Sequence, residues 1–278
     1  MSRIAIVALR IAAVGVVAAT ASLAGPASRA LAYPGGTPSF VTDVAPYCAS
    51  CHSSVSEDQL VGAPPARVSA ELAANKHIAK IQNAGDGSPY NGLSAAQRQE
   101  LIAGIQKIDA ATRITLNAPA TAKPGELIDV LVEVTGGSAP VLGIALVDAN
   151  QRWQASPASS AGWQVTAKPV VTGPDGKPQT KFTDGRNPTL RPGTTYVNVD
   201  GIRADPLAGK FSTVKVAWKL RAPASPGEVP LVAVLLYGTE LSSPNGAVET
   251  PTSKGPIGGL GGSSGRVKFS DVRSVAVK

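Results

Sequence analysis

The spacing of apolar residues changes partway along the chain, and this change limits the folds that the chain can adopt. In the first part, Leu101, Ile105 and Ile108 recur at the i, i+4, i+7 spacing of one face of an α-helix. Later, apolar and more polar residues alternate along 127–134, which is typical of a half-buried β-strand. The pattern therefore predicts an α + β protein with two domains that meet near residue 112.

The first domain, predicted over residues 33–112, contains two helix patterns. One runs over 67–82 and the other over 93–108. Ser94 is a good N-cap for the second helix, and Gln97 stands three residues later, as a capping box requires. We expect this second helix to be the more clearly defined of the two.

The second domain is predicted as an immunoglobulin-like β-sandwich over residues 113–250. Seven to nine short strand patterns are separated by turns rich in Gly and Pro, which favours that fold, and we expect its tryptophans in the core. Residues 251–278 follow as a Gly/Ser-rich linker and one final strand. Besides 127–134, the strand candidates are Leu142–Val147, Trp163–Thr166, Thr195–Val199, Thr213–Leu220, Val229–Tyr237 and Arg266–Phe269. Val229–Tyr237 is apolar on both faces, which predicts a central strand.

Residues 1–32 have the features of a secretory signal peptide. Arg3 is followed by an uncharged run from Ile11 to Ala24, and Ala30-Leu31-Ala32 forms a small-x-small cleavage site. An uncleaved N-terminal anchor is the alternative, but Arg10 interrupts the apolar stretch. We therefore expect an exported protein, periplasmic or at the cell surface, with no transmembrane span in the mature chain.

Charge gives no support to nucleic-acid binding. Removal of residues 1–32 deletes three arginines and no acidic residue, which lowers the formal net charge from +7 to +4. The remaining charges are spread along the chain without a basic run, so a nucleic-acid partner is not expected.

One motif carries chemistry, the stretch Cys48-Ala49-Ser50-Cys51-His52. C-x-x-C-H is the attachment signature of c-type haem. The two thiols of Cys48 and Cys51 form thioethers with the haem vinyl groups, and His52 follows at the position of the proximal iron ligand. The sequence therefore predicts one covalent haem c and its iron.

Two other uses of these residues are less favoured. A disulfide or thioredoxin-like dithiol needs only C-x-x-C, but no βαβ pattern surrounds this motif. Zinc needs four ligands, and the two cysteines and two histidines are the only soft candidates in the chain. Neighbouring Cys51 and His52 rarely bind one ion together, so haem is favoured.

From about Thr37 to Ala111 the chain resembles class I c-type cytochromes. The resemblance rests on the C-x-x-C-H motif near the start of the mature chain and on the helix over 93–108, which is similar to their C-terminal helix. It implies an electron carrier rather than an enzyme, with redox proteins as transient partners. One feature departs from the family, because the loop over 83–92 lacks the usual Met ligand and Met1 is the only Met of the chain.

His77 is the hypothetical sixth ligand of the iron, because it is the only other histidine. The alternatives are a solvated surface histidine, with an open iron site or with Lys76, Lys80 or Tyr90 as the ligand. Ligation by two histidines implies a lower potential than Met/His ligation, since Met raises the potential.

Roughly over Ile114–Val248 the chain resembles reeler (reelin N-terminal) domains. The resemblance rests on Gly162–Val165 and on Trp218–Pro223, after which Gly227-Glu228-Val229 leads into the next strand. It implies a β-sandwich with an interaction role, which would act on a partner or at the cell surface. Two other functions stay open, a haem sensor or peroxidase-like protein with an open distal site, and an adhesive surface module with an accessory haem.

Overall fold

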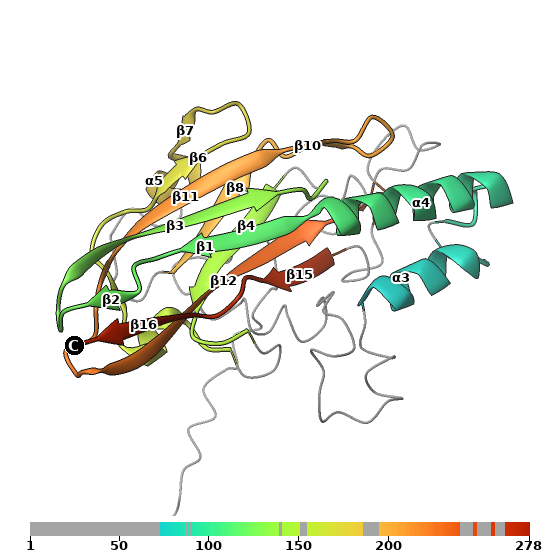
Figure 1. Cartoon of the computed structure of the whole chain (residues 1–278). Helices are drawn as coiled ribbons and strands as arrows, with labels where there is room; N and C mark the ends of the chain where they lie inside the picture. The colour runs from blue at the N-terminus through green and yellow to red at the C-terminus, as the bar shows by residue number, and fades with distance from the viewer. Residues whose placement is uncertain are drawn as a thin grey trace, which may run out of the picture.

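A computed structural model gives the fold of the chain. It describes residues 73–86, 88, 90–138, 141–150, 155–185, 195–239, 247–248, 257–258 and 265–278. The predicted signal peptide and the residues Cys48, Cys51 and His52 lie outside these ranges. The described part begins with two helices, and the part of the chain that follows them is mostly β-sheet (Figure 1).

The two helices are α3 (Ala73–Gln82) and α4 (Ala95–Ala111). Ser94 caps α4 as predicted, since its side chain accepts a hydrogen bond from the backbone N–H of Gln97. The Gln97 side chain in turn accepts from the backbone N–H of Ser94, which completes the capping box. The helix buries Ile102, Ile105 and Ile108 along one face, so the predicted helical period is confirmed.

A single residue, Thr112, separates α4 from the first strand of the β-rich part. The predicted change of period near residue 112 is therefore a direct passage from helix to strand. The strand it enters, β1, lies at the edge of a six-stranded sheet with the order β1-β3-β11-β6-β7, in which β5 also pairs with β11. The strands are β1 (Arg113–Asn117), β3 (Leu127–Thr135), β5 (Gln164–Val165), β6 (Val170–Thr172), β7 (Pro178–Gln179) and β11 (Thr213–Arg221).

A second six-stranded sheet has the order β2-β16-β12-β4-β8, with β15 also paired to β12. The strands are β2 (Thr121–Ala122), β4 (Val141–Val147), β8 (Tyr196–Asp200), β12 (Gly227–Gly238), β15 (Gly265–Phe269) and β16 (Arg273–Val277). On one side β12 pairs with β4, and on the other it pairs first with β16 and then with β15. The apolar stretch predicted as a central strand is therefore central.

Four short strands and two short helices complete the described elements. They are β9 (Ala204–Asp205), β10 (Lys210–Phe211), β13 (Ala247–Val248), β14 (Ile257–Gly258), the 3-10 helix η3 (Ala158–Ala161) and α5 (Lys181–Gly185).

The two large sheets share one hydrophobic core. Buried residues of β3 and β11 from one sheet and of β4, β12 and β16 from the other belong to the same cluster. Trp163 and Trp218 are buried in it, as predicted, and Trp153 lies outside the described residues. Ile108 of α4 also joins this cluster, so the helix packs against the β-rich part. This layering is compatible with the expected β-sandwich.

The C-terminal segment differs from the prediction of a linker and one final strand. It contributes two strands, β15 and β16, and both pair with the central strand β12. Val275 and Val277 of β16 lie in the core shared by the two sheets. The last residues of the chain are therefore an integral part of the second sheet.

Within the described ranges, no helix combines the length and the apolar character that crossing a membrane requires.

Candidate functional site

His77 is the one predicted site residue that the structure describes. It lies on α3, and its exposed fraction is 0%. The alternative of a solvated surface histidine is therefore wrong. The ring lies beside a small hydrophobic cluster of the helical part, because its neighbours on α3 and in the following loop, Ile81 and Tyr90, belong to that cluster together with residues of α4.

Both ring nitrogens of His77 are hydrogen-bonded. Its Nε2 lies 3.0 Å from the hydroxyl oxygen of Tyr90, whose side chain is also fully buried. Its Nδ1 lies 3.2 Å from Nη2 of Arg266. Arg266 belongs to β15, so a residue near the C-terminal end of the chain meets the ring of a residue 189 positions earlier.

The Arg266 guanidinium is held on three sides. Besides its contact with His77, its Nε donates to Oδ2 of Asp109 at 3.2 Å, and its Nη1 donates to the carbonyl oxygen of Gly265 at 3.1 Å. The side chain of Arg266 is 0% exposed, while that of Asp109 is 19% exposed. A buried guanidinium is tolerated only with an opposite charge and good hydrogen bonds, and Asp109 supplies that charge.

Asp109 lies on α4 and joins the helices to the second sheet. Its Oδ1 accepts a hydrogen bond of 2.8 Å from the hydroxyl group of Tyr237 on β12. Lys268 of β15 donates to the backbone carbonyl oxygens of Asp109 and of Thr112, the latter at 2.9 Å. These bonds satisfy carbonyl groups at the end of α4, which have no partner within the helix. We call the set His77, Tyr90, Asp109, Tyr237, Arg266 and Lys268 the His77 network.

Burial and the negative charge of Asp109 act in opposite directions on the pKa of Lys268. Burial lowers the pKa of its ammonium group below the ordinary value of 10.5, and Asp109 acts in the opposite direction. The positive charges of Arg113 and Arg266 add to the lowering. Lys268 thus lies close to another cation of its own strand, and the shared Asp109 offsets part of their repulsion.

Sequence reasoning missed most of the His77 network. Asp109, Tyr237, Arg266 and Lys268 come from elements that are distant along the chain, and no local spacing connects them with His77. One signal was present, because Arg266 and Lys268 alternate with apolar residues on a predicted strand. Two cations on one face of a strand indicate a polar contact that pairs them.

The haem ligands proposed from sequence can be compared with the structure at three positions. The His77 ring is buried beside apolar side chains, which fits a haem ligand, but Nε2 already contacts Tyr90. Iron binding through this nitrogen therefore requires that the Tyr90 contact be given up. Among the alternative ligands, Tyr90 is buried in the same cluster, whereas Lys80 is exposed. Across the part of the chain that the structure describes, no group of three or more His, Cys, Asp or Glu side chains could hold a metal.

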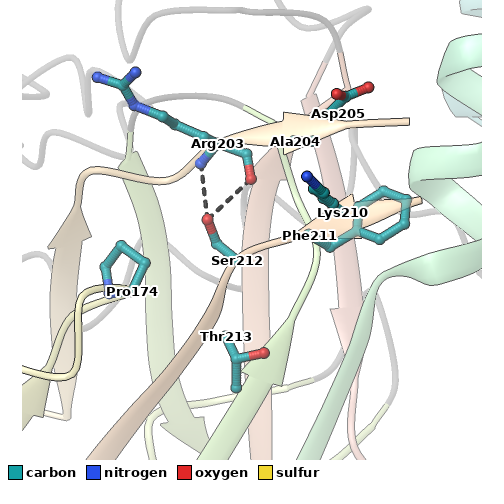
Figure 2. A pocket seen from close by; sticks show the side chains of 8 residues that line it. All are labelled: Pro174, Arg203, Ala204, Asp205, Lys210, Phe211, Ser212 and Thr213. Carbon is teal, nitrogen blue, oxygen red and sulfur yellow. Dashed lines mark hydrogen bonds between the residues drawn. The ribbon is translucent and has the colours of Figure 1, made fainter. Parts of the chain in front are cut away.

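A hollow of about 560 Å³ lies at the base of the hairpin formed by β9 and β10 (Figure 2). Ser212 closes the hairpin, because its hydroxyl group accepts from the backbone N–H of Arg203 and donates to the Arg203 carbonyl, both at 2.9 Å. None of the predicted site residues lines this hollow. The hollow shares no lining residue with the His77 network.

No profile of a known protein family matches the chain, and no curated protein is similar to it in sequence. The resemblances to c-type cytochromes and to reeler domains therefore rest on their short motifs and, for the cytochromes, on the helix over 93–108.

Proposed function

We propose that the chain is an exported monohaem c-type cytochrome that transfers electrons, in which a cytochrome-like helical module precedes a reeler-like, immunoglobulin-type β-sandwich. The observation that carries this proposal is the motif Cys48-Ala49-Ser50-Cys51-His52, which uses both cysteines of the chain. The secretory signal predicted over residues 1–32 supports it, since covalent haem attachment takes place outside the cytoplasm. The sandwich would hold the haem module against a redox partner or at the cell surface.

In this proposal each residue of the candidate haem site has one role. Cys48 and Cys51 bind the haem covalently, and His52 is the proximal ligand of its iron. The bound group supplies reversible one-electron chemistry between the ferric and ferrous states. Ile81, Tyr90 and other residues of the helical cluster exclude water from the surroundings of His77. His77 is the candidate that the sequence offers for the sixth position, which its Nε2 would take only by giving up the Tyr90 contact.

The visible absorption spectrum of the purified mature protein tests the proposal. The protein should be made with a competent haem-attachment system and measured oxidised and reduced. We expect a c-type spectrum that survives denaturation, because the haem is held by thioethers. A variant with Cys48→Ser and Cys51→Ser should lose the covalent haem, whereas Ser50→Ala, between the two cysteines, should keep it. Wild-type protein without covalent haem would overturn the proposal.

A haem-based sensor or peroxidase-like protein is the second candidate function. The contact between His77 Nε2 and Tyr90 favours it, because a ring engaged in this way leaves the sixth position open. An open site predicts a high-spin ferrous spectrum and rapid binding of carbon monoxide. A low-spin spectrum that is lost in His77→Ala would instead support electron transfer with His77 as the ligand. An unchanged low-spin spectrum in that variant would exclude His77.

A further inference from the structure

The contact between His77 and Arg266 fixes which nitrogen of the imidazole ring carries the proton. A guanidinium has N–H donors and no acceptor, so Nδ1 of His77 must accept at the 3.2 Å contact. In the neutral ring the proton is then on Nε2, which donates to the Tyr90 hydroxyl oxygen at 3.0 Å. A proton on Nδ1 would instead set N–H against N–H inside a buried site.

Arg266 cannot easily turn away from the ring. Its Nε bond to Asp109 and its Nη1 bond to the Gly265 carbonyl fix the plane of the guanidinium. Asp109 is itself held by the hydroxyl group of Tyr237. A donor that is fixed by charge-assisted hydrogen bonds imposes a strong preference on the group it faces.

We propose that Arg266 is a positioning residue that holds His77 as the tautomer with its proton on Nε2, and so keeps the nitrogen nearest Tyr90 from binding iron. The consequence for iron rests on the proposed haem and favours an open sixth position over His77 as the ligand, whereas the tautomer does not depend on haem. A metal-binding imidazole usually donates its second N–H to an acceptor, which fixes the ligating nitrogen as the unprotonated one. Arg266 offers the reverse, because a donor faces the second nitrogen. The β-rich part of the chain thus controls a side chain of the helical part.

Two substitutions of Arg266 separate this role from a merely structural one. Arg266→Lys keeps a donor-only cation, so it should preserve the tautomer. Arg266→Gln removes the donor-only cation that faces Nδ1 and leaves a neutral amide with both donors and an acceptor, so it should make the other tautomer accessible. Tyr237→Phe is the matched control, since it removes a bond to Asp109 and has no hydrogen bond to His77 among the described contacts.

The tautomer can be measured by nitrogen-15 NMR of the full mature chain labelled at histidine. The chain has two histidines, and a His77→Asn variant assigns the signals. In the reduced carbon monoxide complex the iron is diamagnetic, and carbon monoxide occupies its sixth position. The spectrum of this complex therefore reports the His77 ring when it is not bound to iron. Should the protein lack haem, the proposed function fails, yet the same spectrum still reads the tautomer.

We expect the proton on Nε2 in wild type, Arg266→Lys and Tyr237→Phe. In Arg266→Gln the ratio of the two tautomers should shift by roughly tenfold or more, the size expected for the loss of one charge-assisted hydrogen bond. A proton on Nδ1 in wild type would overturn the proposal, and so would equal tautomer ratios in the Lys and Gln variants. If Arg266→Gln fails to fold, the wild-type spectrum still tests the proposal, because a proton on Nδ1 there would overturn it.

Discussion

Asp109 on α4 accepts a hydrogen bond of 2.8 Å from the hydroxyl group of Tyr237 on β12, across 128 residues of chain. The same carboxylate binds the buried guanidinium of Arg266. One side chain of a helix thus connects two neighbouring strands of a sheet. The helices and the second sheet therefore depend on each other through a shared acid.

Asp109→Asn should lower the free energy of unfolding by about 3 kcal/mol, because it leaves the buried Arg266 cation without its counter-charge. Urea denaturation of the full mature chain measures this loss. Asp129→Asn is the control, since its pair with Lys219 is exposed and should contribute less than about 1 kcal/mol. Equal effects of the two substitutions would contradict the role assigned to Asp109.

Gly136→Ala should be strongly destabilising, by at least about 3 kcal/mol. Gly136 has a φ of +109°, and a Cβ atom there would lie 2.5 Å from the Cα atom of Thr112. The added methyl group would therefore collide with backbone at the passage from α4 to β1. Thermal unfolding should show a large drop in Tm.

Gly176→Ala is the matched control for that substitution. Gly176 also has a positive φ, +76°, but a Cβ atom there would meet nothing within 4 Å. Only the left-handed backbone then opposes the change, at a cost of about 1 kcal/mol. A loss at Gly176 as large as that at Gly136 would show that the contact with Thr112 is unimportant.

Ser94→Ala should lower the free energy of unfolding by about 1 kcal/mol, because the first turn of α4 loses the acceptor for the Gln97 N–H. Ser94→Asp should keep most of this stability, since aspartate is an equally good N-cap. Urea denaturation of both variants separates the capping bond from other effects of the position. Identical losses in the two variants would argue against it.

Lys268 should give stability a specific pH dependence. Because burial lowers its pKa in the folded chain, the unfolded chain binds more protons between that lowered pKa and 10.5. The free energy of unfolding of wild type should therefore rise, relative to Lys268→Met, as the pH increases through this window. Below the window the difference should be constant.

The measurement for Lys268 is the difference between the two urea-denaturation series across alkaline pH. Subtraction removes the contributions of groups that titrate alike in both proteins. A difference that falls with pH would mean that Asp109 outweighs burial and that the pKa of Lys268 is raised rather than lowered.

Features that depend on neighbouring residues were predictable from the sequence. The capping box at Ser94, the buried face of α4 and the central strand β12 follow from spacing and apolar character alone. The second C-terminal strand was missed because Arg273–Val277 is short and follows β15 after only a brief interruption. Its pairing partner, β12, lies far earlier in the chain, and no local pattern indicates it.

In the candidate site, too, features that depend on neighbouring residues were predictable and features that depend on distant residues were not. Spacing predicts haem attachment at Cys48, Cys51 and His52, whereas it predicts nothing about the surroundings of His77. That ring contacts Arg266 of the strand that begins at Gly265, and in the sequence Arg266 resembles an ordinary surface cation. Burial of such a residue depends on tertiary contacts with Asp109, which spacing does not encode.

The pairing of β15 and β16 with β12 also has a consequence for biosynthesis. A ribosome releases the chain from its N-terminus, so β12 emerges well before the two strands that flank it on one side. The Arg266 that meets His77 emerges only with them. The second sheet and the His77 network therefore cannot be completed until residues 265–277 have been synthesised, although most of their partners are already present.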